Sequence, residues 1–456
     1  MRSLLSARPS SRWSSCWSSS WAGPLTRART TSSTARFAAG LAAGLAGALA
    51  LSVAGPLAAP ASAKPARQIS YHQWDSPKRL DHGRLAGLTV RAGRLQIGDP
   101  VGTRRYADPH AGGGRVRYEI GRWTSPWRDA GFGFTELIPS WKATVDGKGF
   151  VRVQVRGRSE HGQRSSWDTI ANWAPDDSTI HRTSLPEQAD DLARVAVDTW
   201  KSNYSLEFTS YQLRLVLFRR PGSAGPRVDT VGAMVSRLPQ VESVRRSRPG
   251  PARGVVLDVP RYSQMIHTGD YPEFGNGGEA WCSPTSTSMV LGYYDRLPAR
   301  RDYRWVMRHH PNRFVDHAAR MTYDYRYDGA GNWPFNTAYA APLAGHAFVT
   351  RLRNLRQAER FIAAGVPVVA SIAFGRGELD GAPISATNGH LVVIVGFTES
   401  GDVVVNDPAA RRNRDVRRTY DRGQFENAWL PASGGLAYII RTDHTRLPAR
   451  HGARNW

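Results

Sequence analysis

Residues 280–285 read Ala280-Trp281-Cys282-Ser283-Pro284-Thr285, and they contain one of only two cysteines in a chain of 456 residues. The other cysteine, Cys16, lies in an N-terminal leader. If that leader is removed, the single thiol that remains cannot form an internal disulfide, and it is poor support for a structural zinc site. Cys282 is then a buried inert thiol, a link to another molecule, or a nucleophile.

The leader has the parts of a secretory signal peptide. Arg27, Arg29 and Arg36 precede an apolar run from Phe37 to Leu57, and Ala61-Ser62-Ala63 offers small residues for cleavage. This order predicts a signal peptide over residues 1–63 and a secreted, extracellular mature protein. An uncleaved membrane anchor is the alternative, but the run is rich in Gly and Ala and only weakly hydrophobic. No later segment reaches transmembrane length, so we expect no stable membrane span after processing.

The mature chain would have 456 − 63 = 393 residues, which suggests two domains, each with its own core. Its net charge would fall from +23 to 23 − 6 = +17, because the leader holds six Arg and no acid. This charge is explained either by a coding bias toward Arg or by attraction to an anionic cell-wall polymer, acidic peptides or nucleic acid. We expect no nucleic-acid partner, because the sequence has no nucleic-acid-binding motif.

Residues 68–238 predict an all-β domain. Val151, Val153 and Val155 alternate with polar residues, as a half-buried antiparallel strand requires, and Asp146-Gly147 before them is a hairpin turn pattern. Similar short stretches recur, which favours a β-sandwich of jelly-roll type. Tryptophans are frequent here, including Trp123, Trp127, Trp141, Trp167 and Trp173. Most are expected in the core, and an exposed row would suit carbohydrate binding.

Residues 239–254 are rich in Arg, Pro and Gly and predict a linker. Residues 255–442 then mix helix and strand patterns, which predicts an α+β domain. A helix is expected over 283–296, with Pro284 in its first turn. A second helix should start after Asn354 and stop at Gly365, and strands are expected over 366–374, 391–397 and 403–407.

A catalytic cysteine must be converted to its thiolate, and two aids are visible here. The predicted helix start at Cys282 offers a positive dipole end. A histidine could take the proton, and His390 has the most suitable surroundings among those downstream. It opens a predicted strand that turns near Ser400 and returns to Asp407, which comes within reach of the imidazole. A purely structural histidine is the alternative.

Two further residues are candidates for the site. Asn406 competes with Asp407, because neighbours on a strand point to opposite faces and only one can orient His390. The sequence pattern leaves that choice open. Gln264, in Val259-Pro260-Arg261-Tyr262-Ser263-Gln264, has an amide that could stabilise an oxyanion together with a backbone N–H near Cys282.

The order Gln264, Cys282, His390, Asp407 resembles that of papain-like cysteine peptidases of the C39 type, especially the soluble C39-like group of bacteria. The strings Trp-Cys-Ser-Pro-Thr-Ser at 281–286, Gly-His-Leu-Val-Val at 389–393 and Asn-Asp-Pro at 406–408 carry the resemblance. It implies a papain-like fold over 255–442, with Cys282 as nucleophile, His390 as base and acid, Asp407 as orienter and Gln264 in the oxyanion hole. Ser283 departs from the glycine that is common in the group.

The sequence therefore predicts a secreted cysteine peptidase that hydrolyses peptide bonds through a thioester, without a cofactor or metal. A peptide or protein is the expected substrate, and an anionic wall polymer or carbohydrate is a candidate ligand of the β domain. One alternative is a wall-peptide amidase or transpeptidase that uses the same residues. The other is a catalytically silent wall- or carbohydrate-binding protein.

Overall fold

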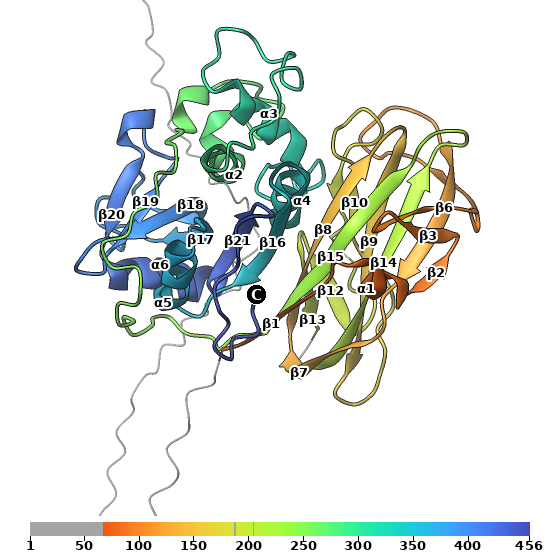
Figure 1. Cartoon of the computed structure of the whole chain (residues 1–456), viewed down its shortest axis with the longest axis horizontal. Helices are drawn as coiled ribbons and strands as arrows, with labels where there is room; N and C mark the ends of the chain where they lie inside the picture. The colour runs from red at the N-terminus through yellow and green to blue at the C-terminus, as the bar shows by residue number, and fades with distance from the viewer. Residues whose placement is uncertain (1–66, 187, 204) are drawn as a thin grey trace, which may run out of the picture.

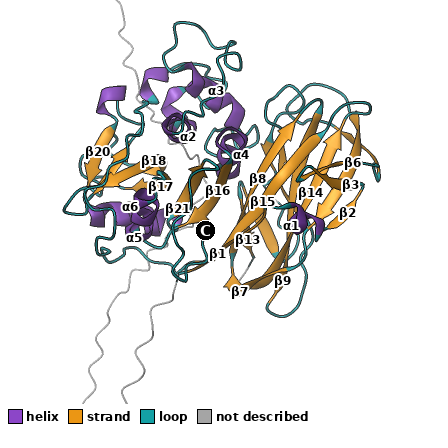
Figure 2. Ribbon diagram, viewed as in Figure 1, coloured by secondary structure: helices purple, strands orange, loops and turns teal. Residues whose placement is uncertain are grey.

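The computed structural model describes residues 67–186, 188–203 and 205–456. The expected signal peptide, residues 1–63, lies outside them. Figure 1 shows an all-β region next to a region of mixed helices and strands, and Figure 2 shows that nearly all the helices belong to the second region. The expected succession of an all-β region and an α+β region is thus confirmed. Within the described residues, no helix is long and apolar enough to cross a membrane.

The all-β region contains two antiparallel sheets and one short helix, α1 (Pro77–Asp81). The first sheet is built from β1 (Gln68–Trp74), β3 (Leu88–Arg91), β4 (Arg94–Ile97), β8 (Glu136–Val145), β12 (Ala193–Ala196), β13 (Thr199–Ser202) and β15 (Pro226–Arg237). The second is built from β2 (Arg84–Ala86), β5 (Gly102–Tyr106), β6 (Val116–Thr124), β7 (Arg128–Phe134), β9 (Gly149–Ser159), β10 (Asp168–Trp173), β11 (Thr183–Ser184) and β14 (Phe208–Arg219).

Apolar side chains from both sheets share one core, which fits a β-sandwich. On β9 the alternation is as expected, because Val151, Val153 and Val155 are fully buried and the residues between them are partly exposed. Trp123, Trp141 and Trp173 also lie in this core. Trp127 and Trp167 do not, and they remain partly exposed on the outer side.

The α+β region is organised around one antiparallel sheet. Its strand order is β16 (His346–Arg351), β21 (Leu436–Arg441), β17 (Val368–Phe374), β18 (Thr387–Phe397), β19 (Val403–Asn406) and β20 (Arg417–Tyr420). Its helices are α2 (Cys282–Tyr293), α3 (Arg313–Thr322), α4 (Trp333–Ala344), α5 (Leu355–Ala363) and α6 (Arg422–Ser433), with 3-10 turns η1 (Met265–His267), η2 (Gly278–Ala280) and η3 (Asn413–Asp415).

Local sequence explains the limits of α5. The Asn354 side chain accepts a hydrogen bond from the backbone N–H of Gln357, which caps the helix start. Leu355, Ala358, Phe361 and Ile362 turn one face to the core, as their spacing predicts. Gly365 follows with φ of 74°, a left-handed conformation that suits glycine and ends the helix.

The two regions share an extensive apolar interface. Phe335 and Ala338 of α4 belong to the core of the β region, and α4 packs against β8. The Arg351 guanidinium donates to Glu136 at 2.6 Å, and the Val349 N–H donates to the Ser140 hydroxyl at 2.9 Å. Segment 239–254 contains no helix or strand, yet it runs along α6, where the Ser247 N–H donates to Glu426. These contacts join the two regions into one body.

Candidate active site

Cys282 is the first residue of α2, a helix buried on all sides in its first three turns. It is the one cysteine among the described residues, and its thiol is buried. The preceding Trp281 is fixed by a hydrogen bond from its indole N–H to the Phe274 carbonyl at 2.6 Å. A thiol at a helix N-terminus lies in a field that favours the thiolate.

The start of α2 packs against the strand that carries His390. The Ser286 hydroxyl, one turn after Cys282, donates to the carbonyl of Leu391 at 3.0 Å. The Ser283 and Tyr438 hydroxyls are 3.0 Å apart, which ties the same turn to β21. The first turn of α2 therefore lies against β18 at the residue after His390, and both Cys282 and His390 are buried.

His390 lies inside β18, three residues after its start, and does not open the strand as the sequence pattern indicated. The strand begins earlier because Thr387 pairs with Phe374 of β17. Nε2 of His390 lies 2.8 Å from Oδ1 of Asp407, just past the end of β19. His390 and Asp407 are 2% and 0% exposed, so solvent hardly screens this pair.

Asp407 is held as a carboxylate by several donors. The Tyr420 hydroxyl donates to Oδ2 at 2.7 Å, and the Ala409 N–H donates to Oδ1 at 3.0 Å. Burial alone would raise the pKa of Asp407, but the charge of nearby His390 and these hydrogen bonds outweigh it and lower the pKa below its ordinary value. The same contact, added to burial, raises the pKa of Tyr420. An ionised Asp407 can hold Nε2 of the His390 imidazole as the protonated nitrogen, which leaves Nδ1 available to accept a proton.

Asn406 is engaged elsewhere. Its amide N–H groups donate to the carbonyls of Val259 and Pro260 at 3.2 and 3.0 Å, and its carbonyl accepts from Arg417 at 2.6 Å. It is paired across the sheet with Val393, three residues after His390. Asn406 thus anchors the segment that leads to Gln264, and Asp407 is the neighbour of His390.

Gln264 is 2% exposed and links the segments that carry Cys282 and Asp407. Its amide N–H donates to the carbonyl of Glu279 in η2 at 2.6 Å, three residues before Cys282. Its backbone N–H donates to the Pro408 carbonyl at 2.9 Å, directly after Asp407. The amide nitrogen carries a second proton, which is the group that an oxyanion would need.

Tyr420 was not found by sequence reasoning. No motif marks it, and its contact with Asp407 depends on the pairing of β19 with β20, where Val403 lies opposite Tyr420. The site therefore gains a buried hydroxyl donor that the linear pattern does not reveal.

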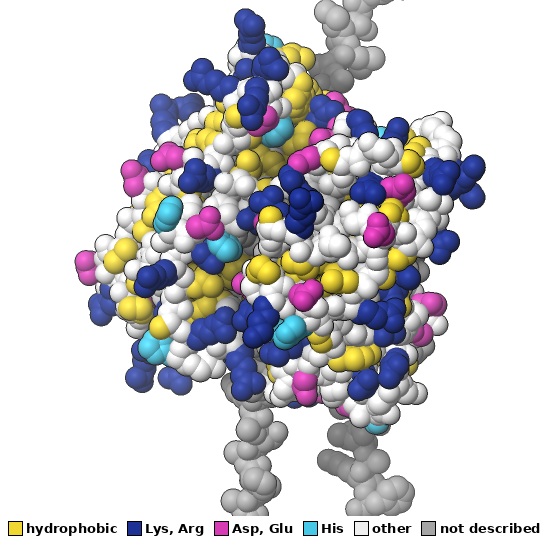
Figure 3. Space-filling model, turned by 45° about the vertical axis from the view of Figure 1, so that its right-hand side comes forward, with side chains coloured by type: hydrophobic (Ala, Val, Ile, Leu, Met, Phe, Trp, Pro, Cys, Tyr) yellow, Lys and Arg dark blue, Asp and Glu magenta, His cyan; other side chains and the backbone are white. Residues whose placement is uncertain are grey.

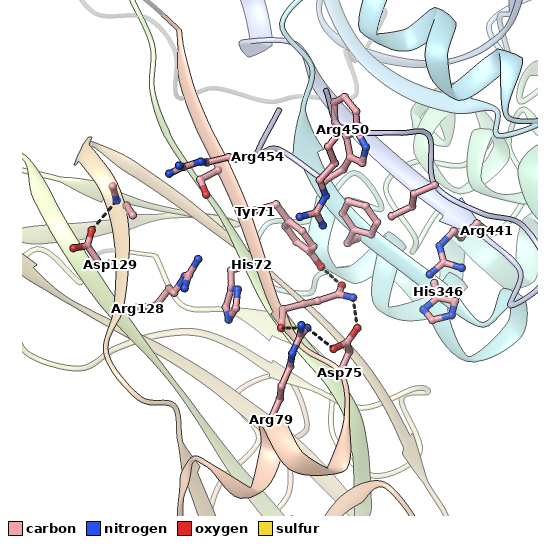
Figure 4. A pocket seen from close by; sticks show the side chains of 17 residues that line it. Tyr71, His72, Asp75, Arg79, Arg128, Asp129, His346, Arg441, Arg450 and Arg454 are labelled. Carbon is pink, nitrogen blue, oxygen red and sulfur yellow. Dashed lines mark hydrogen bonds and ion pairs between the residues drawn. The ribbon is translucent and has the colours of Figure 1, made fainter. Parts of the chain in front are cut away.

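A separate cavity of about 560 Å³ lies between the two regions, and none of Gln264, Cys282, His390 and Asp407 lines it. Figure 4 shows arginines around it, contributed by α1, β7, β21 and the last ten residues of the chain. Burial, together with Arg128 and Arg79, lowers the pKa of His72 to about 4. The cavity is thus a basic compartment apart from the candidate active site. On the side of the molecule shown in Figure 3, further Lys and Arg side chains lie on the surface of both the β region and the α+β region.

Comparison with known families gives two matches in succession. A family model described as the Peptidase C39 N-terminal domain matches residues 70–236, and one described as the Peptidase_C39 like family matches residues 256–436. No curated protein matches the chain in a sequence search. The second match contains Gln264, Cys282, His390 and Asp407.

Proposed function

We propose that this chain, which belongs to the C39-like peptidase family, hydrolyses peptide bonds with Cys282 as nucleophile, His390 as base and acid, Asp407 as orienter and Gln264 in the oxyanion hole. The observation that carries this assignment is the buried His390–Asp407 contact of 2.8 Å beside the N-terminus of α2. Family membership suggests a cysteine peptidase, and the assignment of these four residues goes one step further. We also propose a papain-like arrangement, with the cysteine helix packed on the sheet that carries the histidine.

The proposed reaction has two halves. His390 takes the proton of Cys282, and the thiolate attacks the carbonyl carbon of a peptide bond. The Gln264 amide and a backbone N–H at the start of α2 stabilise the oxyanion, and the imidazolium protonates the leaving amine. Water, deprotonated by His390, then cleaves the thioester and restores the thiol. Asp407 remains ionised throughout and stabilises the imidazolium.

The test compares the purified chain with Cys282→Ala on a diverse peptide library and purified wall fragments, read by mass spectrometry. Val101→Ala, at an exposed position of the β region, is the control and should leave cleavage unchanged. Cleavage that survives Cys282→Ala refutes the assignment. A ligated product in the presence of an added amine would instead favour the transpeptidase alternative over hydrolysis.

We further propose that the β region binds an anionic polymer through the outer face of its second sheet. Five arginines lie there on β6, β9 and β14, at positions 122, 152, 156, 158 and 214. None of them has a carboxylate within ion-pair distance among the residues that the structure describes. Burial, followed by repulsion from Arg122 and Arg156, lowers the pKa of Arg214 to about 10. Such uncompensated charge attracts polyanions.

Two partly exposed tryptophans lie among these arginines. The guanidinium of Arg214 is 3.8 Å from the ring centre of Trp167, and that of Arg158 is 4.5 Å from that of Trp127. A pull-down of the full chain on immobilised polyphosphate and on a neutral glucan tests this surface. We expect retention on polyphosphate that falls with salt and with Arg214→Gln, and not with the exposed control Arg301→Gln. Equal retention of both variants on polyphosphate contradicts binding through this face, and retention on the glucan alone contradicts an anionic ligand.

Export is also a proposal, and it rests on the leader sequence of residues 1–63. N-terminal sequencing of protein recovered from culture medium tests it. We expect the mature chain to begin near Lys64, and recovery of the uncleaved chain from the cell fraction alone would contradict it.

A further inference from the structure

Four titratable side chains from separate segments converge beside the turn that carries Gln264. His267 ends η1, Asp270 follows in the next turn, His310 precedes α3, and Asp316 lies in the first turn of α3. Nδ1 of His267 lies 3.2 Å from Oδ2 of Asp316 and 3.5 Å from Oδ2 of Asp270. Nδ1 of His310 lies 3.1 Å from Oδ1 of Asp316 and 3.2 Å from Oδ2 of Asp270.

The innermost members of this cluster lack hydrogen bonds. His267 and Asp316 are both 0% exposed. Among the residues that the structure describes, the two ring nitrogens of His267 have no hydrogen-bond partner. Oδ2 of Asp316 has none among these residues either. The 3.2 Å approach of His267 Nδ1 to Oδ2 of Asp316 therefore lacks the alignment of an N–H···O hydrogen bond. Buried polar atoms nearly always have partners, so these atoms point to a ligand at their common centre.

The spacing of the cluster suits a metal ion. One ligand atom from each of His267, Asp270 and Asp316 can be chosen so that all three lie within 4.8 Å of one another. Metal–ligand bonds of about 2.0–2.1 Å in a tetrahedral site place neighbouring ligand atoms roughly 3.3 Å apart. The contacts of 3.2 and 3.5 Å from His267 to the two carboxylates match that separation.

We infer that His267, Asp270 and Asp316 bind a divalent transition-metal ion, with Zn²⁺ the best fit, and that His310 orients the two carboxylates. Two ionised carboxylates and neutral imidazoles would leave two negative charges in a largely buried place, which a divalent cation neutralises. Imidazole ligation favours zinc and its neighbours over Ca²⁺ or Mg²⁺, which take oxygen ligands.

The site lies next to the proposed oxyanion residue. Gln264 caps η1 and its carbonyl accepts from the His267 N–H at 3.1 Å, so an ion on His267 would tie this turn to α3. The His267 ring centre is 5.9 Å from that of Trp281, the residue before Cys282. The ion would thus act as a positioning element for Gln264. This consequence rests on the proposed function, whereas metal binding itself does not.

The experiment uses the full chain with both Cys16→Ala and Cys282→Ala, so that no thiol can bind the metal. After the chain is stripped with a chelator, Zn²⁺ is titrated calorimetrically and Co²⁺ is followed by its visible absorption. We expect one equivalent to bind, and His267→Gln and Asp316→Asn to lower the affinity by at least about 100-fold. His310→Gln should lower it roughly 10- to 100-fold, as second-shell losses do. The exposed neighbour His309 provides the control, and His309→Gln should bind as tightly as the parent.

A second measurement does not depend on how the variants fold. X-ray absorption at the zinc edge of the parent chain should report nitrogen and oxygen ligands at about 2.0–2.2 Å. Undiminished binding in folded Asp316→Asn, a shell of water alone, or no stoichiometric binding overturns the site. In the chain with Cys282 intact, removal of the ion should lower kcat/KM. A chain that binds the ion but cleaves no peptide refutes the proposed function and leaves the metal site standing.

Discussion

Replacement of Asp407 by Asn tests the electrostatic part of the proposed mechanism. The change is nearly isosteric, and the amide oxygen can still accept from His390 and from the Ala409 N–H. What disappears is the negative charge beside the imidazolium. For a contact of 2.8 Å between these buried groups, the charge centres are roughly 4 Å apart, which corresponds to about 4 kcal/mol at an effective dielectric constant of about 20. That difference is about 10³-fold in rate.

The assay is kcat/KM for a cleavable peptide, together with the rate of Cys282 alkylation by iodoacetamide between pH 5 and 8. We expect kcat/KM to fall about 10³-fold and the alkylation profile to shift to higher pH, because the imidazolium that stabilises the thiolate has lost its partner. Asp415→Asn, an exposed carboxylate, is the charge control. A loss of less than about threefold, with an unchanged alkylation profile, would refute the reasoning.

Three further predictions concern other buried contacts. Tyr420→Phe removes a donor to Asp407 and should lower the free energy of unfolding by about 1.5–3 kcal/mol at pH 7. Because the pKa of Asp407 is lowered in the folded state, this loss should fade as the pH falls through that pKa. Denaturation at pH 7 and pH 3 would check this. Burial raises the pKa of Asp198 to about 7 from 3.8, so the folded state binds more protons between these values and stability falls as the pH rises. Asp198→Asn should therefore match the parent near pH 4 and exceed it by up to about 4 kcal/mol at pH 8 in urea unfolding, and a constant difference would count against this. Phe335→Ala should cost about 3–5 kcal/mol, visible as a lower denaturation midpoint by tryptophan fluorescence.

Much of the chemistry could be predicted because it is encoded in short strings. Pro284 and the small residues after Cys282 mark a helix start, and His390 and Asp407 flank a hairpin of recognisable length. The choice between Asn406 and Asp407 was not predictable, because valines occupy both alternating sets of β19. It depends on where strand pairing stops: Asn406 is still paired, whereas Asp407 lies past the end and turns to the imidazole.

Contacts between distant segments left no linear pattern. The group of His267, Asp270, His310 and Asp316 is assembled from turns some forty residues apart, and its histidines look like ordinary loop residues in the sequence. The linker provides another example. Its crowded Arg, Pro and Gly residues predict a loose connection, yet Ala252 is fully buried and Arg422 donates to the Ser247 carbonyl at 2.8 Å. Such outcomes depend on which surfaces meet, which local composition does not encode.

Helix α4 packs into the core of the β region, and this has a consequence for limited proteolysis. Phe335 and Ala338 lie in the core of the β region, so separation of the two regions would expose that core to water. A protease that cleaves the exposed stretch near Val241 should therefore produce two fragments that stay associated in size-exclusion chromatography and separate only on denaturation. Either fragment expressed alone should be insoluble, and the two together should reconstitute one particle.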